Sequence, residues 1–286
     1  MRKDFCVFIL THGRPDNVIT INALKRSGYT GKVYLVIDNE DKKAAKYYEN
    51  YGKENILMFD KVAIAKTFDT GDNFNDRRGA VYARNACFIL AKELGIKYFI
   101  QLDDDYTVFQ YRYNNKLDYN YILIRKLDAI FSIMLKFLTS TNTKTIAMAQ
   151  GGDFIGGENC SNAEQLKLTR KCMNTFICKT ADRITFIGAI NEDVNTYVDS
   201  GRKGDLFFTF NAVSVVQKQT QSNPGGMTDI YLAGGTYKKS FYTVMMQPSS
   251  VKITLMGSRF MRIHHRISWN NTVPKILREA VRNGQT

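Results

Sequence analysis

Apolar and polar stretches alternate regularly along the first third of the chain. Bare apolar runs such as Phe5–Leu10 are each followed by polar turn residues and then by apolar positions at helical spacing, as at Val18, Ile21 and Leu24. This pattern predicts strands at residues 5–10, 32–37, 56–59 and 98–102, and helices near 18–28, 44–51 and 82–94. Alternation of this kind predicts an α/β fold whose sheet is mostly parallel and covered by helices on both faces.

The pattern changes after residue 105. Aromatic residues follow an alternating pattern from Tyr106 to Tyr113, which predicts an antiparallel strand or ribbon whose rings either pack in the core or stack on bases. A long helix is expected over residues 121–138, and later helices near 229–232 and 274–281. Because no repeat or linker interrupts the chain, we expect one domain over residues 1–286, with a nucleotide-binding half at 1–145 and a half for a second substrate at 146–286.

Composition narrows the class of protein. The 286 residues are 44% hydrophobic with four prolines, which is typical of a folded chain, and no apolar run reaches the ~18 residues of a membrane span. The five cysteines form no C-x-x-C pair, so neither a disulfide framework nor a zinc site is indicated. We therefore expect a protein of the reducing cytoplasm without a membrane partner.

Positive charge is concentrated at the end of the chain. Forty Lys and Arg against 27 Asp and Glu give a net charge of +13. Between Ser249 and Thr286 a single acid, Glu279, stands against seven bases: Lys252, Arg259, Arg262, Arg266, Lys275, Arg278 and Arg282. Such a segment binds nucleic acid, an anionic nucleotide or acidic lipids, or it is only a solvated surface.

Three consecutive aspartates, Asp103, Asp104 and Asp105, follow the expected strand at 98–102. Ligands of open α/β sheets bind at the carboxyl ends of the strands. Crowded carboxylates raise one another's pKa unless a cation lies among them, and oxygen ligands suit Mg²⁺ or Mn²⁺. The motif therefore predicts a metal and diphosphate site, the alternative being an acidic turn.

The turn after the first strand matches no common nucleotide motif. Thr-His-Gly-Arg-Pro supplies one glycine where a dinucleotide fingerprint needs three, and the chain contains no Walker A sequence. Asp38, at the end of the second strand, is placed either to accept hydrogen bonds from a base or ribose or to cap a turn. Arg14 and Arg84 are expected to approach phosphates.

Four stretches of the sequence carry a resemblance to a known family: FCVFILTHGRPDN, VYLVIDNED, GDNFNDRRGAVYARNACFILAKELGIKYFIQLDDDY and IGAINEDVNTY. They resemble GT-A-fold glycosyltransferases that use nucleotide sugars. More closely, they are similar to the phage and bacterial TET-associated glycosyltransferases, which add sugars to hydroxymethylated pyrimidines in DNA. The likeness covers nearly the whole chain, and the segment Gly225–Asp229 resembles the narrower family.

The resemblance assigns a metal site. Asp105 matches the direct metal ligand of the D-x-D pair, and Asp103 matches the residue nearer the ribose or a metal-bound water. His264 or His265 is the candidate third ligand, and Mn²⁺ or Mg²⁺ the candidate ion. Neighbours on a strand point to opposite faces, so only one histidine can ligate, and the alternative is that both line a basic surface.

The resemblance also assigns the catalytic and donor residues. Asp193 matches the general base of inverting enzymes and Glu192 its orienting neighbour, the alternative being a helix start rich in acids that complement its dipole. Thr11, Asp72 and Asp104 join the donor site.

Taken together, these features imply a GT-A-like fold with an antiparallel ribbon on the acceptor side. They imply metal-dependent transfer from a UDP-sugar to a hydroxymethylpyrimidine in DNA with inversion, in the host cytoplasm if the chain is phage-encoded. The DNA backbone is expected at Arg259, Arg262 and Arg266. The alternatives are a glycan, protein or lipid acceptor, a nucleotidyltransferase, or a non-catalytic DNA-binding protein.

Overall fold

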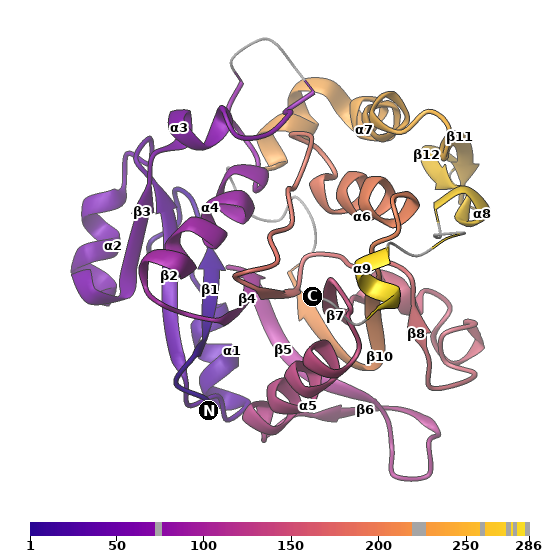
Figure 1. The fold of residues 1–286 in the computed structure, drawn as a ribbon, viewed down its shortest axis with the longest axis horizontal. Coiled ribbons are helices and arrows are strands. Elements are labelled where there is room, and N and C mark those ends of the chain that lie inside the picture. Colours follow the sequence, from indigo (N-terminus) through magenta and orange to yellow (C-terminus); the bar gives the residue numbers. More distant parts are fainter. Residues whose placement is uncertain (72–75, 219–226, 258–260, 273–275, 277–278, 284–286) are drawn as a thin grey trace.

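The structure is a computed structural model that describes residues 1–71, 76–218, 227–257, 261–272, 276 and 279–283. Within these residues the main sheet has ten strands (Figure 1): β1 (Phe5–Leu10), β2 (Lys32–Asp38), β3 (Ile56–Phe59), β4 (Tyr98–Asp103), β5 (Tyr106–Tyr113), β6 (Tyr119–Leu123), β7 (Thr145–Ala149), β8 (Leu168–Thr169), β9 (Phe176–Lys179) and β10 (Phe207–Gln217). Their order across the sheet is β3-β2-β1-β4-β9-β7-β10-β5-β6, with β8 paired to β10.

Strand directions divide the sheet into two parts. β3, β2, β1 and β4 are mutually parallel, as expected for strands joined by helices. β9 runs antiparallel between β4 and β7, and β10 pairs in parallel with β7 but antiparallel with β5, which pairs antiparallel with β6. Most strands therefore run in one direction, with β9, β5 and β8 against them.

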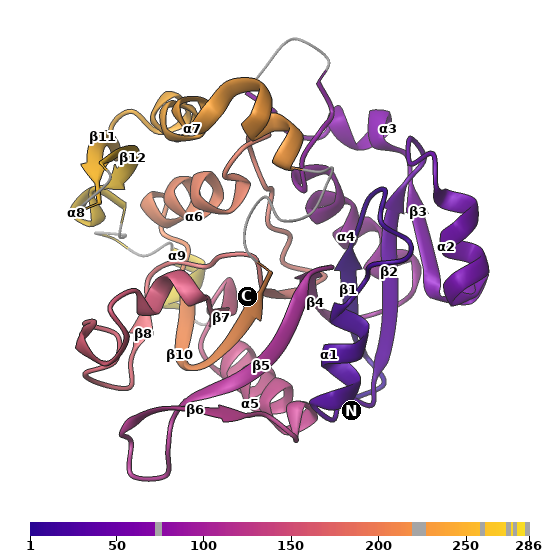
Figure 2. The ribbon, with the colours of Figure 1, turned by 180° about the vertical axis from the view of Figure 1, so that it is seen from behind.

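Helices cover both faces of the sheet (Figures 1 and 2). In the described residues they are α1 (Thr20–Arg26), α2 (Ala44–Tyr51), α3 (Lys61–Ala65), α4 (Val81–Glu93), α5 (Leu127–Ser140), α6 (Glu192–Arg202), α7 (Met227–Met246), α8 (Trp269–Thr272) and α9 (Glu279–Arg282). The predicted fold class, a mixed and mostly parallel α/β sheet with helices on both faces and an antiparallel ribbon, is confirmed.

The strand β1 explains why the core has two layers. Its side chains alternate between two apolar clusters, Phe5, Val7 and Ile9 facing one and Cys6, Phe8 and Leu10 the other. The first cluster is closed by α1, α2 and α5, and the second by α3, α4 and α6. A strand buried on both faces needs a continuous apolar run, which is what residues 5–10 supply.

Three predicted helices differ in extent from the structure. The helix expected over 121–138 begins only at Leu127, because Tyr119–Leu123 pairs with β5 as strand β6. This segment is rich in residues that favour strands, and tertiary pairing decides its conformation. The helix expected near 229–232 is part of the longer α7, and of the one expected near 274–281 the described residues show α9, which continues to Arg282.

A second, two-stranded sheet lies beside the main one. β11 (Val251–Met256) and β12 (Arg262–Ile267) form an antiparallel hairpin against α7, at the right of Figure 1. The Ser240 hydroxyl of α7 donates to the Ile263 carbonyl at 2.9 Å. The basic end of the chain is thus fixed to α7 rather than to the main sheet.

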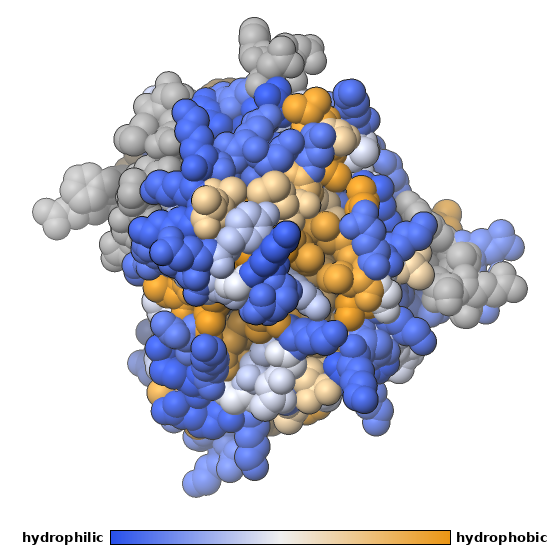
Figure 3. Space-filling view, turned by 90° about the vertical axis from the view of Figure 1, so that its left-hand side faces the viewer, coloured by the Kyte–Doolittle hydropathy of each residue, from blue (hydrophilic) through white to orange (hydrophobic). Residues whose placement is uncertain are grey.

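The opposite side of the molecule carries the β3 edge of the sheet. Apolar side chains reach the surface there between polar ones (Figure 3). Met58 of β3 and Val62 of α3 are among the exposed large apolar residues. None of the described helices combines the length and the apolar character needed to cross a membrane.

Candidate active site

Asp104 joins the end of β4 to the turn that follows β1. One carboxylate oxygen accepts a hydrogen bond from the Thr11 hydroxyl at 2.7 Å, and the other accepts one from Arg14 Nη1 at 2.9 Å. The Thr11 hydroxyl also lies 2.9 Å from the Tyr47 hydroxyl of α2. Both oxygens of Asp104 therefore have partners, and the predicted donor residues Thr11, Arg14 and Asp104 come together.

Asp103 and Asp105 flank Asp104 in the sequence, and their carboxylates have fewer partners. Asp103 Oδ1 is 3.2 Å from Arg84 Nη2, whereas Asp105 Oδ1 is buried without a hydrogen-bond partner among the described residues. Burial raises the pKa of Asp103 to about 7, against the opposing charge of Arg84, and burial together with Asp104 raises the pKa of Asp105 to about 6. Partly buried carboxylates with raised pKa values fit a hard divalent cation such as Mn²⁺ or Mg²⁺.

Lys218 is a cation near these carboxylates that sequence reasoning missed. It follows β10, and its backbone N–H donates to the Asp105 carbonyl at 3.2 Å. Burial raises the pKa of both Asp104 and Asp105, and the positive charge of Lys218 opposes that rise. No local pattern marks Lys218, because β10 reaches the site only by pairing with β5.

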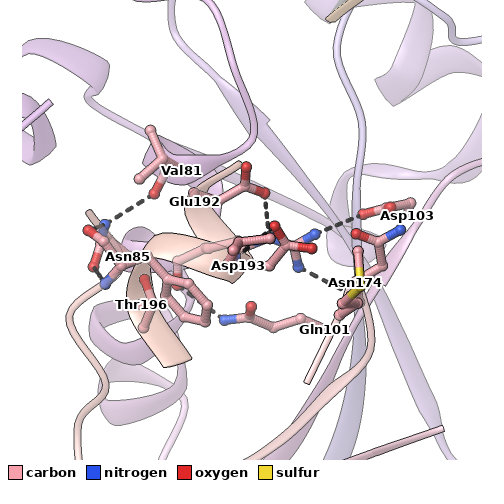
Figure 4. A network of polar contacts seen from close by, with 12 residues as sticks. Val81, Asn85, Gln101, Asp103, Asn174, Glu192, Asp193 and Thr196 are labelled. Carbon is pink, nitrogen blue, oxygen red and sulfur yellow. Dashed lines mark hydrogen bonds and ion pairs between the residues drawn. The ribbon is translucent and has the colours of Figure 1, made fainter. Parts of the chain in front are cut away.

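Arg84 lies inside the protein. Its side chain is 1% exposed, with Nε 2.8 Å from Glu192 Oε1 and Nη1 donating to the Asn174 carbonyl at 3.1 Å (Figure 4). Its guanidinium carbon lies 5.1 Å from the centre of the Phe176 ring. The structure thus places Arg84 in a network inside the protein, with donors directed to Glu192, Asn174 and Asp103, and its approach to a phosphate stays a prediction.

Glu192 and Asp193 form the first turn of α6, where the helix dipole favours acids. Both are buried, and Figure 4 shows them with Asp103 around the Arg84 network. Asp193 Oδ1 accepts from the Val194 N–H at 2.8 Å, while burial and the neighbouring Glu192 raise its pKa. The structure thus brings both residues to the same region as the end of β4.

Asp38 is also more enclosed than predicted. Its carboxylate accepts from the Glu40 N–H at 3.1 Å, and its Oδ2 lies 2.7 Å from His12 Nδ1 and 3.3 Å from Lys61 Nζ. The hydrogen bond to Asp38 raises the pKa of His12, whose side chain is 45% exposed. The group that reaches solvent here is His12, which sequence reasoning missed. It lies two residues after β1, the strand that pairs with β2, which ends in Asp38.

The two late histidines lie elsewhere. His264 and His265 are on β12 against α7, with ring centres 4.4 Å apart, and burial lowers the pKa of each. In both ribbon views β12 is well separated from the end of β4 (Figures 1 and 2). Among the described residues no three His, Cys, Asp or Glu side chains form a group that could hold a metal. The structure therefore does not place either histidine beside Asp103 and Asp105.

Comparison with known families decides the class of the protein. The sequence model of the TET-Associated Glycosyltransferase family matches residues 5–226, which span β1 to the end of β10 and include the aspartates and α6. The chain belongs to the TET-associated glycosyltransferase family. It is therefore a glycosyltransferase.

Solved structures show a looser likeness to this TET-associated glycosyltransferase. Glucosyl-3-phosphoglycerate synthase from Mycobacterium tuberculosis, in complex with Mn²⁺, UDP and phosphoglyceric acid, is 9% identical over 92% of this chain and 86% of that chain, with a TM-score of 0.47. The mannosyltransferase PcManGT from Pyrobaculum calidifontis, with GDP-Man and Mn²⁺, is 13% identical over 80% of this chain and 60% of that chain, with a TM-score of 0.46. No curated protein matches the chain.

The remaining predicted residues of this TET-associated glycosyltransferase divide into two groups. Asp72, Arg259 and the glycines of Gly225–Asp229 lie outside the residues that the structure describes. Arg262 and Arg266 are exposed on β12 and share a face of the hairpin with Lys252, which is paired with Arg266. The hairpin thus presents a basic face to solvent.

Proposed function

We propose that this glycosyltransferase moves a sugar from a UDP-sugar to the hydroxymethyl group of a 5-hydroxymethylpyrimidine in DNA, with inversion at the anomeric carbon. The observation that carries the proposal is the meeting of two acidic segments at Arg84. These are the end of β4, where one Asp105 oxygen has no hydrogen-bond partner among the described residues, and the start of α6, with the buried Asp193. The first segment suits a donor diphosphate with its metal, and the second suits proton removal from an acceptor.

On the donor side we assign residues 1–145. Asp103 and Asp105 would hold Mn²⁺ or Mg²⁺, and the ion, when bound, neutralises charge on the departing diphosphate. Arg14, 20% exposed beside Asp104, and Lys218 supply fixed positive charge near the same place. Thr11 and Asp104 hold the turn after β1 in position. Neither His264 nor His265 is included, since both lie on the hairpin.

On the acceptor side Asp193 takes the proton from the hydroxymethyl group. As the proton leaves, the hydroxymethyl oxygen bonds to the anomeric carbon, and the electron pair of the broken carbon–oxygen bond departs with UDP. Attack from the side opposite the diphosphate inverts the carbon. Burial raises the pKa of Asp193, which suits it to remove this proton, because efficient general bases titrate near the working pH.

Residues 146–286 are assigned to the acceptor. The exposed Arg262, Arg266 and Lys252 are suited to hold the phosphate backbone, and Arg259 belongs to the same basic run. A net charge of +13 also favours a polyanionic acceptor over a neutral glycan or a protein.

Mass spectrometry of nucleosides tests this proposal. Duplexes containing hydroxymethylcytosine or hydroxymethyluracil, with plain duplex as control, are incubated with the protein, Mn²⁺ and a panel of UDP-sugars. We expect the mass of one sugar on the hydroxymethylated nucleoside only, together with released UDP. UDP release with unchanged DNA would point to another acceptor, pyrophosphate release to nucleotidyl transfer, and no reaction with any donor to a DNA-binding protein.

A further inference from the structure

One buried arginine connects the two acidic segments of the site. Arg84 belongs to α4, yet its guanidinium reaches Glu192 at the start of α6, Asp103 at the end of β4 and the carbonyl of Asn174 before β9. Three separate segments thus meet at one side chain, through three different nitrogens. Figure 4 labels the three partners, Glu192, Asn174 and Asp103. A planar guanidinium presents these donors in fixed directions, which a lysine ammonium does not.

The surroundings of Arg84 hold it in place. Its guanidinium carbon lies 5.1 Å from the ring centre of Phe176 and 5.9 Å from that of Phe186, and these two rings pack against each other at 4.9 Å. The backbone carbonyl of Arg84 accepts from Gln101 Nε2 of β4 at 2.9 Å. Side chain and backbone are therefore both fixed, and the Arg84 guanidinium is shielded from water.

Backbone strain lies on both sides of this arginine. Asn174, whose carbonyl accepts from Arg84, has φ of 57°, and Asn191, the residue before Glu192, has φ of 54°. Residues other than glycine rarely adopt this left-handed region, and they stay in it only where surrounding contacts hold them. The Asn191 side chain is anchored on α7, donating to the Thr243 hydroxyl at 2.9 Å. Strain of this kind is typical of sites where geometry is set for function.

We propose that Arg84 is a positioning residue that fixes the start of α6 relative to the end of β4, so that Asp193 faces the sugar held at Asp103 and Asp105. This inference rests on the proposed role of Asp193 as the base. Without the guanidinium, Asp103 and the buried Glu192 and Asp193 would repel one another, and the first turn of α6 would move away from β4. Arg84 itself contacts neither donor nor acceptor.

The inference is tested with Arg84→Lys, because lysine keeps a positive charge but lacks the several fixed N–H donors of the guanidinium. We expect kcat to fall by about 10²-fold, the effect of a misplaced reacting group, while the affinity for UDP in Mn²⁺ stays close to that of the wild type. UDP affinity is expected to hold because Thr11, Arg14 and Asp105 keep their places and the lysine ammonium keeps a positive charge beside Asp103. Calorimetry of UDP binding and the thermal midpoint are measured alongside the rate.

Arg112→Lys is the matched control. Arg112 is also a buried arginine, with Nε donating to the Ser214 hydroxyl at 2.7 Å and its guanidinium 4.3 Å from the centre of the Phe154 ring. Its contacts within the described part of the chain include none of the site residues, so its variant should lower the thermal midpoint similarly and leave kcat unchanged. An equal loss of kcat in both variants would make Arg84 merely structural.

A double-mutant cycle with Asp193→Asn decides the inference. If Arg84 acts through Asp193, adding Arg84→Lys to Asp193→Asn should lower kcat further by no more than about twofold. If instead the kcat losses of the two single variants multiply in the double variant, the positioning role is overturned and the base assignment stays intact. An Asp193→Asn enzyme with wild-type kcat would instead overturn the proposed base, and with it this inference. If Arg84→Lys does not fold, Glu192→Gln, which removes the other half of the ion pair, takes its place in the cycle with the same expectation.

Discussion

Asp104 and Asp105 are adjacent in the sequence, but their carboxylates differ in their hydrogen-bond partners. Asp104 is satisfied by Thr11 and Arg14, whereas Asp105 keeps a buried oxygen without a partner among the described residues. Asp105→Ala should therefore weaken UDP-sugar binding in Mn²⁺ by at least about tenfold, because a hard ligand is lost. Calorimetry with Mn²⁺ and with EDTA measures this, and the chelator should reduce wild-type affinity to that of the variant. The exposed Glu93→Ala is the control, and full affinity of Asp105→Ala would remove Asp105 from the metal site.

His12 makes stability depend on pH. Its pKa is raised from 6.5 by the hydrogen bond to Asp38, with Asp41 at 3.8 Å adding to this and Lys61 opposing it. The stabilisation is therefore fully present below pH 6.5 and is lost as pH rises through the higher folded-state pKa of His12.

The variant His12→Gln tests this linkage. Its thermal midpoint should lie below that of the wild type at a pH under 6.5, and the difference should shrink as pH increases. Differential scanning calorimetry across this range gives the comparison. A difference that stays constant or grows with pH would show that His12 is not held in its charged form by Asp38.

Individual residues show where sequence reasoning reaches its limit. The grouping of Asp103 to Asp105 at a strand end was predictable because it needs only the strand and the motif. The burial of Arg84 was not, because its partner Glu192 lies 108 residues away in the sequence. The same holds for His264 and His265, whose position depends on how the β11–β12 hairpin packs.

At the scale of elements, strongly periodic segments were predicted well. α2 and β3 have the predicted bounds, and α4 differs by one residue at each end. β9 was not predicted as a separate strand, because four residues between irregular segments give no clear period. Its insertion between β4 and β7 can be recognised only once distant parts of the chain are paired.

The β11–β12 hairpin is the element expected to hold DNA. Neutralising Arg262 and Arg266 to glutamine should weaken modified and unmodified duplexes alike, since phosphate contacts carry no base information. Each lost contact should flatten the slope of log K against log salt by about 0.9. Fluorescence anisotropy over a salt series measures both effects, and transfer to a free nucleoside should be spared. If DNA binding and slope remain while UDP-sugar binding falls, the hairpin belongs to the donor site.

At the scale of the molecule, the predicted donor and acceptor halves share one sheet. β4 pairs with β9 and β5 with β10, and the apolar cluster around Ile9 includes Ile146 and Val213. Residues 1–145 alone would expose this cluster, so we expect the fragment not to fold cooperatively. Circular dichroism through a thermal scan, compared with the full chain, provides the measurement. A cooperative transition of the fragment would show two independent domains.

The central claim is that Asp193, at the start of α6, removes the proton of the acceptor next to the donor held at the end of β4. Its most direct test is the turnover of Asp193→Asn with UDP-sugar, Mn²⁺ and hydroxymethylated DNA, with donor and DNA affinities measured on the same protein. We predict that kcat falls by roughly 10²–10⁴, the usual contribution of a positioned general base, while both affinities stay close to those of the wild type. Wild-type kcat, or a loss confined to KM, would contradict the claim.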